Sequence, residues 1–535
     1  MPAPPANSIL RLFYGPIISP VTPRLAKYLP HALICIDNGT ISWIEEDIKH
    51  EDELSKVLEA KDIVGCEVTR LRHGQFLMPG FIDTHTHAPQ FPNLGRGGQY
   101  ELLDWLDKLT FPTEAKFGNS KYATKVYRSV VKRLLDCGTT TCCYYSSAHV
   151  VGSRILADIV HASGQRAFIG LCNMDRHVPD TYLKGITHDD SLNDARESIE
   201  YTLSLKSPLI RPILTPRFAI SCSGPLLQGL GDIISEYPEH ALRIPVQTHL
   251  AENRNEIDFT ASLFPDHESY THIYESHGLL GPATILAHGC YLTEKELKLI
   301  KESGAGVSHC PTSNFHLNSG IAKVGEWLDA GVKVGLGTDV SGGFSPSMLT
   351  AIQHASIAAK VIAMQTPPVP AKSNGASGHT NGTNGHTNGH VNEETNGHDN
   401  NGETNGHTTN GHTNGHIHGI NGHSESPLAN KPLSIPSLLY LATLGGAQLV
   451  AIEDQTGSLD PGKAFDALLV DLRPETGNPN LWWDEHEEGE AGVDKDPVHE
   501  LQDFLEKFFF CGDDRNIAEV YVQGRMVAGK NGQAV

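Results

Sequence analysis

The chain has 535 residues, of which 39% are hydrophobic, and a formal net charge of −22. Its length favours a large domain with a smaller accessory domain. The excess negative charge disfavours nucleic acid and anionic membranes as partners, but it does not exclude a small neutral substrate. The N-terminus lacks a basic start followed by a long apolar core, and no run of about 18 apolar residues occurs, so we expect neither a signal peptide nor a membrane span, and a cytoplasmic location.

Both ends of the chain are predicted to be rich in β-structure. Short strand-like segments occur at 32–36 and 40–44 near the N-terminus, and at 467–471 and 517–522 near the C-terminus. Because both flanks are rich in β-structure and lie at opposite ends of the chain, we expect them to pair with each other. The sequence therefore predicts one composite domain built from residues 1–75 and 450–535.

Between these flanks, short apolar runs alternate with longer amphipathic stretches, which is the pattern of parallel βα units. Eight such units predict an α/β fold with a closed (β/α)8 TIM barrel at 76–449. The predicted strands lie at 77–87, 138–145, 166–175, 209–217, 243–252, 284–289, 304–311 and 331–340.

Metal-ligating side chains recur where these predicted strands end. His85 and His87 close the first strand as HTH, and side chains two residues apart point to the same face of a strand. His249, His288 and Asp339 each end a later strand. In a barrel of this type the carboxyl ends of the strands face one crevice. Each residue alone is as readily a core histidine or a turn aspartate, but their recurrence in register predicts a Zn(II) site.

Glu252 lies three residues after His249 and is the predicted general acid/base, because a carboxylate beside activated water commonly transfers protons. The alternative is a glutamate that stabilises the N-terminus of a following helix. Two other zinc motifs are excluded, since neither HExxH nor HxE…PCxxC occurs in the chain.

Residues 373–425 repeat Asn-Gly-His and contain nine of the 29 histidines. This stretch has almost no large apolar residues, so it is predicted to be a disordered insertion within the barrel region. A metal-binding tract and a segment that drives condensation or protein interaction are the alternatives.

The motifs MPGFIDTHTH, HLAE, AHGCYL, SHCPTSN and GTDVSGG, in this order, resemble the signatures of the amidohydrolase superfamily. Near the C-terminus, GSLDPGKAFDALLVD is similar to the segment that closes the small β-sandwich of that superfamily. The resemblance covers nearly the whole chain except the Asn/Gly/His-rich stretch. It implies a metal-dependent hydrolase with a TIM barrel and a β-sandwich formed by the N- and C-terminal segments.

Three further segments resemble the guanine deaminases, one family of that superfamily. They are APQ at 88–90, LDWL at 103–106 followed by TFP at 110–112, and TPRF at 215–218. This resemblance implies four zinc ligands, namely His85, His87, His249 and Asp339. It implies catalytic roles for Glu252, Asp339 and His288. It implies a purine held by Gln90, Arg217, Phe218, His249 and His288.

The resemblance implies hydrolysis of guanine to xanthine and ammonia by a homodimer. Members of the superfamily with two metals commonly carry a carboxylated lysine on the fourth strand, whereas here the nearest lysine is Lys206, before that strand. We therefore expect one zinc ion per subunit. The alternatives are a related deaminase acting on 8-oxoguanine, cytosine, adenine or a triazine, and a non-catalytic scaffold with the same fold.

Overall fold

The computed structural model describes residues 10–237, 244–366, 427–482 and 496–530. The insertion predicted at 373–425 lies outside the described residues. Within the described part of the chain, no helix is both long enough and apolar enough to cross a membrane.

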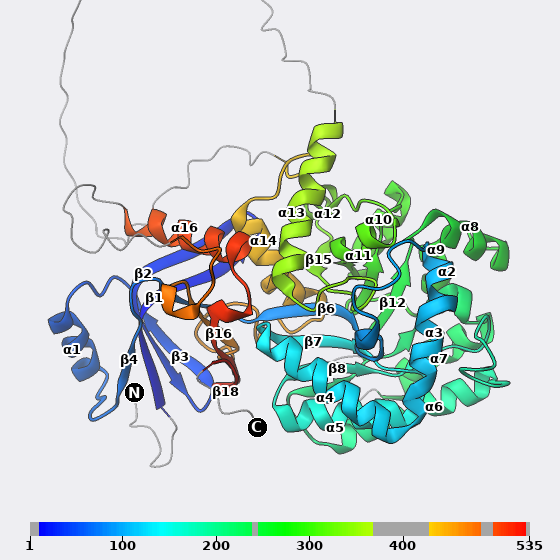
Figure 1. Cartoon of the computed structure of the whole chain (residues 1–535), viewed down its shortest axis with the longest axis horizontal. Coiled ribbons are helices and arrows are strands. Elements are labelled where there is room, and N and C mark those ends of the chain that lie inside the picture. Colours follow the sequence, from blue (N-terminus) through cyan, green and yellow to red (C-terminus); the bar gives the residue numbers. More distant parts are fainter. Residues whose placement is uncertain (1–9, 238–243, 367–426, 483–495, 531–535) are drawn as a thin grey trace, which may run out of the picture. The chain divides into compact units, whose positions relative to one another are not determined.

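Strands from both ends of the chain form one eight-stranded sheet, in the order β18-β17-β16-β5-β1-β2-β3 with β4 beside β1 (Figure 1). Strands β5 and β16 pair antiparallel, with Leu77 opposite Leu469. Strands of both flanks therefore lie in one sheet, in which β5 stands between β1 and β16. The elements of this part are β1 (Leu10–Thr22), β2 (Leu25–Asp37), β3 (Thr40–Glu45), α1 (Glu51–Ala60), β4 (Val68–Arg70), β5 (Gln75–Pro79), β16 (Ala467–Asp471), β17 (Ile517–Val522) and β18 (Arg525–Ala528).

Strand β2 illustrates why these segments adopt the extended conformation. Its apolar residues alternate between two faces, because successive side chains of a strand point in opposite directions. Ala32, Ile34 and Ile36 join a core cluster shared with strands from both ends of the chain. Leu33 and Cys35 point the other way and pack in a cluster that includes α1. Both faces of β2 are therefore covered.

The central part of the chain contains parallel strands arranged as β10-β8-β7-β6, β11-β9 and β12-β13-β14-β15. These groups are linked by further backbone contacts. A parallel bridge joins Leu214 to Val246, and the backbone N–H of Asp339 donates to the carbonyl of His85 at 2.8 Å. The strands are β6 (Phe81–His87), β7 (Thr139–Tyr145), β8 (Arg166–Gly170), β9 (Cys172–Asn173), β10 (Ile210–Pro212), β11 (Thr215–Pro216), β12 (Val246–Leu250), β13 (Thr284–His288), β14 (Gly306–His309) and β15 (Lys333–Leu336).

Each of the eight predicted strands coincides with at least one observed strand, but three are broken. The segments 166–175 and 209–217 each form two short strands, β8 with β9 and β10 with β11. The segment 77–87 breaks at Gly80, where a Cβ atom would lie 2.2 Å from side-chain atoms of Thr140. Its first part, β5, belongs to the sheet of the termini, and only β6 joins the parallel strands.

Helices alternate with the parallel strands, as predicted, and their ends follow from the sequence. Helix α10 (Glu294–Ser303) begins with a capping box between Thr293 and Glu296 and ends at Gly304, whose φ of 76° suits glycine. The other helices are α2 (Leu102–Trp105), α3 (Phe111–Glu114), α4 (Ser120–Asp136), α5 (Val150–Ser163), α6 (His188–Ser204), α7 (Gly224–Glu236), α8 (Arg254–Leu263), α9 (Tyr270–Ser276), α11 (Pro311–His316), α12 (Val324–Ala330), α13 (Met348–Gln365), α14 (Ile435–Ala442), α15 (Leu444–Leu449) and α16 (Pro497–Cys511). Short 3-10 and π-helical turns are η1 (Ala88–Asn93), η2 (Leu106–Thr110), η3 (Ala115–Gly118), η4 (Ala219–Ser221), η5 (Pro474–Thr476) and η7 (Asp514–Asn516).

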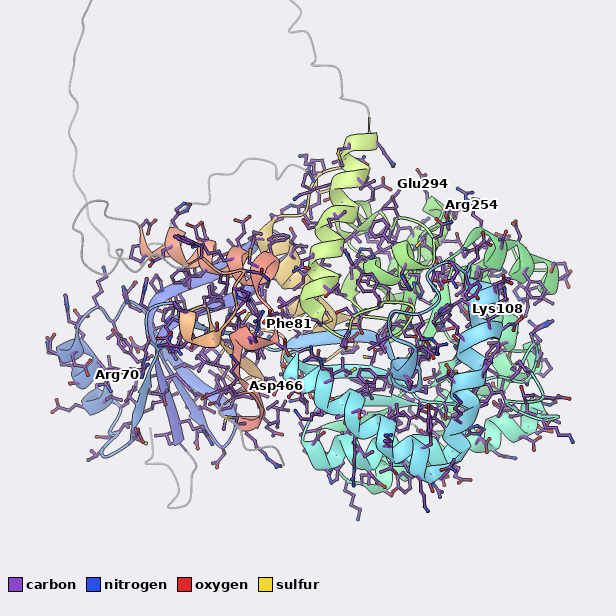
Figure 2. The ribbon with its side chains drawn as sticks, in the orientation of Figure 1. Arg70, Phe81, Lys108, Arg254, Glu294 and Asp466 are labelled. Atoms are coloured by element: carbon purple, nitrogen blue, oxygen red, sulfur yellow. The ribbon has the colours of Figure 1, made fainter. Side chains whose placement is uncertain are left out.

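A buried ion pair connects the parallel strands to the sheet of the termini. Nε of Arg166, on β8, lies 2.8 Å from Oδ2 of Asp466, which precedes β16. The backbone carbonyl of Asp466 accepts from the N–H of Gly80 at 3.0 Å. Phe81 and Asp466 are labelled at this junction in Figure 2. The start of β6, the strand that carries HTH, is therefore fixed against the terminal sheet.

Candidate active site

Five side chains meet at the carboxyl ends of the parallel strands. Possible ligand atoms of His85, His249, His288 and Asp339 all lie within 4.8 Å of one another. His87 completes the group, with Nε2 at 3.1 Å from Nε2 of His249 and 3.5 Å from Oδ1 of Asp339. The sequence predicted that these five residues would meet, and the structure brings all five together.

The chemistry of this group fits a metal ion. Burial lowers the pKa of His87 and of His249 well below the usual value, so both imidazoles are neutral. Two neutral ring nitrogens at 3.1 Å need either a shared proton or a cation between them. Nε2 of His288 is also buried and has no hydrogen-bond partner. Clustered imidazoles with a carboxylate are the donor set that transition metals such as zinc prefer.

Hydrogen bonds at the far side of two rings select the nitrogen that faces this centre. Nδ1 of His249 donates to the backbone carbonyl of Arg217 at 2.6 Å. Nδ1 of His288 donates to Oδ1 of Asn314 at 2.9 Å. In His249, whose pKa is lowered by burial, Nε2 is thus left with its lone pair toward the cluster, as in metal sites generally. In His288 burial also lowers the pKa, but the charges of Glu252 and Asp339 outweigh that effect and raise it. Sequence reasoning did not select Asn314, although it lies within the SHCPTSN motif.

Asp339 follows β15 in a left-handed backbone conformation with φ of 46°. Burial raises its pKa, but the hydrogen bond and charge of His85 outweigh that effect and hold the pKa of Asp339 well below its usual range. The carboxylate of Asp339 lies close to the backbone of Gly342. A side chain at position 342 would not fit, since its Cβ atom would lie 2.7 Å from Oδ2 of Asp339. Asp339 is therefore ionised, as a metal ligand or a proton acceptor must be.

Asp83 is a buried carboxylate that sequence reasoning missed. Its Oδ1 accepts from the backbone N–H groups of His85 and of Thr338, at 3.2 and 3.0 Å. The hydroxyl of Thr338 donates to Oδ2. Burial raises the pKa of Asp83 to about 7. Asp83 therefore joins β6 to Thr338, the residue before Asp339. The sequence signal that could have revealed this role was an acidic residue inside a strand predicted to be buried.

Glu252 is buried and lies beside the cluster. Its Oε2 is 3.5 Å from Nε2 of His288, and its Oε1 accepts from the hydroxyl of Ser319 at 2.8 Å. Burial raises the pKa of Glu252 to about 7, even though His288 acts to lower it. A carboxyl group with such a pKa can both donate and accept a proton near neutral pH.

A pocket opens beside the cluster. The residues that line it are His87, Gln90, Leu102, Trp105, Leu106, Arg217, Phe218, His249, Glu252, Leu317 and Asp339. The three residues predicted to hold a substrate, Gln90, Arg217 and Phe218, are among them. The pocket thus combines an apolar and aromatic wall with a few polar groups, the usual composition of a small-molecule site.

Two polar residues that line this pocket, Gln90 and Arg217, are held from behind by Glu114, the last residue of α3, which sequence reasoning also missed. Its carboxylate accepts from Nη1 of Arg217 at 2.8 Å and from Nε2 of Gln90 at 2.9 Å. The centroid of the Phe218 ring, which also lines the pocket, lies 6.3 Å from that of the His249 ring. Lys206, by contrast, is exposed and precedes β10.

A model of the family described as the amidohydrolase family matches residues 76–376 and 424–527 of the chain. The chain is 36% identical over 527 residues to a guanine deaminase of Dictyostelium discoideum, which covers 98% of this chain and 99% of that protein. It is 35% identical over 497 residues to the guanine deaminase of Mus musculus, covering 93% and 92% of the two chains.

Among solved structures, the chain is similar to that of guanine deaminase from C. acetobutylicum with bound guanine in the active site. The TM-score is 0.74 at 29% sequence identity, and the similarity covers 97% of this chain and 100% of that one. The likeness therefore extends over the terminal sheet, the parallel strands and the pocket.

Proposed function

The chain belongs to the amidohydrolase family and, within it, to the guanine deaminases, and on that premise we propose that it hydrolyses guanine to xanthine and ammonia. The observation that carries this proposal is one arrangement of side chains. Glu252 and Asp339 lie beside a cluster of four histidines, and both line a pocket that also contains Gln90 and Arg217. Relatives with this activity match the chain over nearly its full length.

We propose that the cluster holds one zinc ion per subunit, through His85, His87, His249 and Asp339, with His288 adjacent. The neutral imidazoles and the ionised carboxylate support this assignment. A zinc ion at this place would activate water for nucleophilic attack at neutral pH. The exposed position of Lys206 supports a single metal, since no lysine lies among the described residues of β10 and β11.

Gln90, Arg217 and Phe218 are the residues we assign to the purine ring, together with His249 and His288 on the side of the reacting carbon. Arg217 is only a donor, so it suits the carbonyl oxygen O6 of guanine. Phe218 suits a ring face. This orientation would direct the exocyclic amine and C2 toward Glu252 and Asp339.

Glu252, Asp339 and His288 are the residues we assign to proton transfer. Asp339, with His288 beside it, orients the attacking water and accepts a proton from it. Glu252 protonates N3, which removes the aromatic character of the C2–N3 bond as the water oxygen adds to C2. A second proton, carried by Asp339 or Glu252, reaches the exocyclic amine, and the C2–N bond breaks to release ammonia. Of the two water protons, one ends on N3 and the other in ammonia.

We also propose that the parallel strands close into a (β/α)8 barrel spanning 76–449, interrupted by the insertion at 373–425. The hydrogen bonds that join Asp339 and Val340 to β6 support closure. Residues 1–75 and 450–535 would form the accompanying β-sandwich, which the presence of β1 to β3 and β16 to β18 in one sheet supports. A homodimer is proposed from the family resemblance alone.

Replacement of Glu252 by glutamine tests the proposed chemistry. The Glu252→Gln variant keeps the size of the side chain but cannot carry a proton to N3, so we expect kcat for guanine to fall by about a thousandfold or more while bound zinc stays near one per subunit. Zinc content measured by atomic absorption accompanies the rate assay. Loss of zinc in parallel with activity would contradict the role assigned to Glu252, because it would make this residue a structural support of the metal site.

A further inference from the structure

Glu114 lies behind two residues that line the pocket, Gln90 and Arg217, and has none of the roles assigned above. It is completely buried at the end of α3. One oxygen accepts from Nε2 of Gln90, and the other accepts from Nη1 of Arg217 and, at 3.0 Å, from the hydroxyl of Tyr182. Three segments far apart in the sequence therefore converge on one carboxylate, which holds two residues of the pocket wall, Gln90 and Arg217.

This carboxylate fixes the orientation of the Gln90 amide. An ionised carboxylate only accepts hydrogen bonds, so the NH2 group of Gln90 must face Glu114. The opposite end of the amide agrees, since Oε1 accepts from the backbone N–H of Ser341 at 3.2 Å. Only the second N–H and the second lone pair of the amide remain for a ligand. Gln90 can therefore present just one hydrogen-bonding pattern to a bound ring.

The same carboxylate balances the charge of Arg217. Both side chains of this ion pair are buried, at 3% and 0% exposure, so water screens neither charge. Burial lowers the pKa of Arg217, but Glu114 outweighs that effect and raises it above the usual value. The pair thus supplies N–H donors to the pocket without adding a net charge to it. A buried arginine without such a partner would attract anions strongly.

We propose that Glu114 is a specificity-determining residue that sets the pocket for neutral 6-oxopurines and against purine anions. This inference rests on the proposed function. Guanine is neutral near pH 7, whereas the product xanthine loses a proton more readily. Because the Glu114–Arg217 pair offers N–H donors without a net charge, the pocket binds the neutral substrate and disfavours the ionised product. Inhibition by the product is thereby limited. Glu114 acts through Gln90 and Arg217 and touches no reacting atom.

The test compares substrate and product affinity in the wild type and in Glu114→Gln, both loaded with zinc. The substitution preserves shape but leaves Arg217 without its counter-charge. We expect KM for guanine to rise by about tenfold or more, with a smaller change in kcat, because a charge-assisted hydrogen bond is lost from the wall and not from the reacting centre. The ratio of the xanthine inhibition constant to the KM for guanine should fall by about tenfold, and fall further as pH rises through the ionisation of xanthine.

Tyr182→Phe is the matched control, since it removes one hydrogen bond from Glu114 without changing any charge. It should leave the ratio of xanthine inhibition constant to KM unchanged within about twofold. An unchanged ratio in Glu114→Gln, or the same shift in Tyr182→Phe, would overturn the inference. If Glu114→Gln does not fold, the pH dependence of xanthine inhibition is measured on the wild type instead. Inhibition should weaken as rising pH converts xanthine to its anion, and stronger inhibition would overturn the inference. Absence of guanine turnover by the wild type would instead overturn the proposed function, and this inference with it.

Discussion

Glu252 and Glu256 are four residues apart, yet their carboxylates have different partners. Oε2 of Glu256 accepts from the backbone N–H groups of Glu252 and Asn253, at 2.7 and 3.1 Å, and so caps the start of α8. The side chain of Glu252 points instead to His288 and Ser319. The residue that caps the following helix is therefore Glu256 and not Glu252. The carboxyl group of Glu252 remains available for proton transfer.

The hydroxyl of Ser319 is the one group that fixes Oε1 of Glu252 by a hydrogen bond within the described residues. In Ser319→Ala we expect kcat for guanine to fall by about tenfold, because the carboxyl group loses a bond of roughly 1–1.5 kcal/mol and samples unproductive orientations. KM and zinc content should stay close to those of the wild type. Steady-state kinetics with zinc analysis checks this, and a variant that loses zinc would show that Ser319 supports the metal site instead.

The sequence was sufficient to predict that the histidines, Asp339 and Glu252 would meet, because each lies at or just after the end of a strand in a recognisable motif. It did not reveal Glu114, Asp83 or Asn314, since their importance lies in contacts with distant segments. Glu114 meets Arg217 across 103 residues of sequence, and Asp83 meets Thr338 across 255. The local sequence pattern does not reveal such long-range pairs. At most, a charged residue within a segment predicted to be buried indicates that a partner must exist.

At the scale of elements, the apolar runs predicted strand positions well and strand continuity less well. Continuity fails where a residue cannot continue the ladder. Pro212, which lacks a backbone N–H, ends β10, and the chain resumes pairing only at Thr215 in β11. At Gly80 the chain passes too close to Thr140 for any side chain. These breaks depend on neighbours in space, which the apolar pattern does not encode.

The ion pair between Arg166 and Asp466 links β8 to the segment before β16, and both side chains are buried. Replacing Arg166 by methionine keeps most of its length but leaves the Asp466 carboxylate without a counter-charge. We expect the free energy of unfolding of the zinc-loaded protein to fall by about 3–5 kcal/mol. Urea unfolding followed by fluorescence measures this change.

The exposed pair between Arg196, on α6, and Glu236, on α7, is the matched control. Its N–O distance of 2.7 Å is as short, but both side chains are more than a third exposed. Arg196→Met should therefore change the free energy of unfolding by less than about 1 kcal/mol. An equal loss in the two variants would show that burial does not set the strength of the Arg166–Asp466 link.

At the scale of the whole molecule, the strand-like flanks predicted that the two ends of the chain pair. Strands of both ends do lie in one sheet, although β5, from the region predicted as barrel, stands between them. The order of strands within that sheet was not predictable, because β5 lies between β1 and β16 through contacts that span most of the chain. The parallel order of the central strands followed from alternation with helices. The family model matches the central strands and the C-terminal flank, at residues 76–376 and 424–527.

The central claim is that this pocket and cluster together deaminate guanine. The most direct measurement follows the ultraviolet spectrum and ammonia release when the wild-type, zinc-loaded protein is incubated with guanine, and in parallel with adenine, cytosine and 8-oxoguanine. We predict one ammonia for each xanthine formed from guanine, and kcat/KM values for the other rings lower by at least about a hundredfold. Turnover of another ring in preference to guanine, with zinc bound, would contradict the account and would show that Gln90 and Arg217 recognise a different substrate.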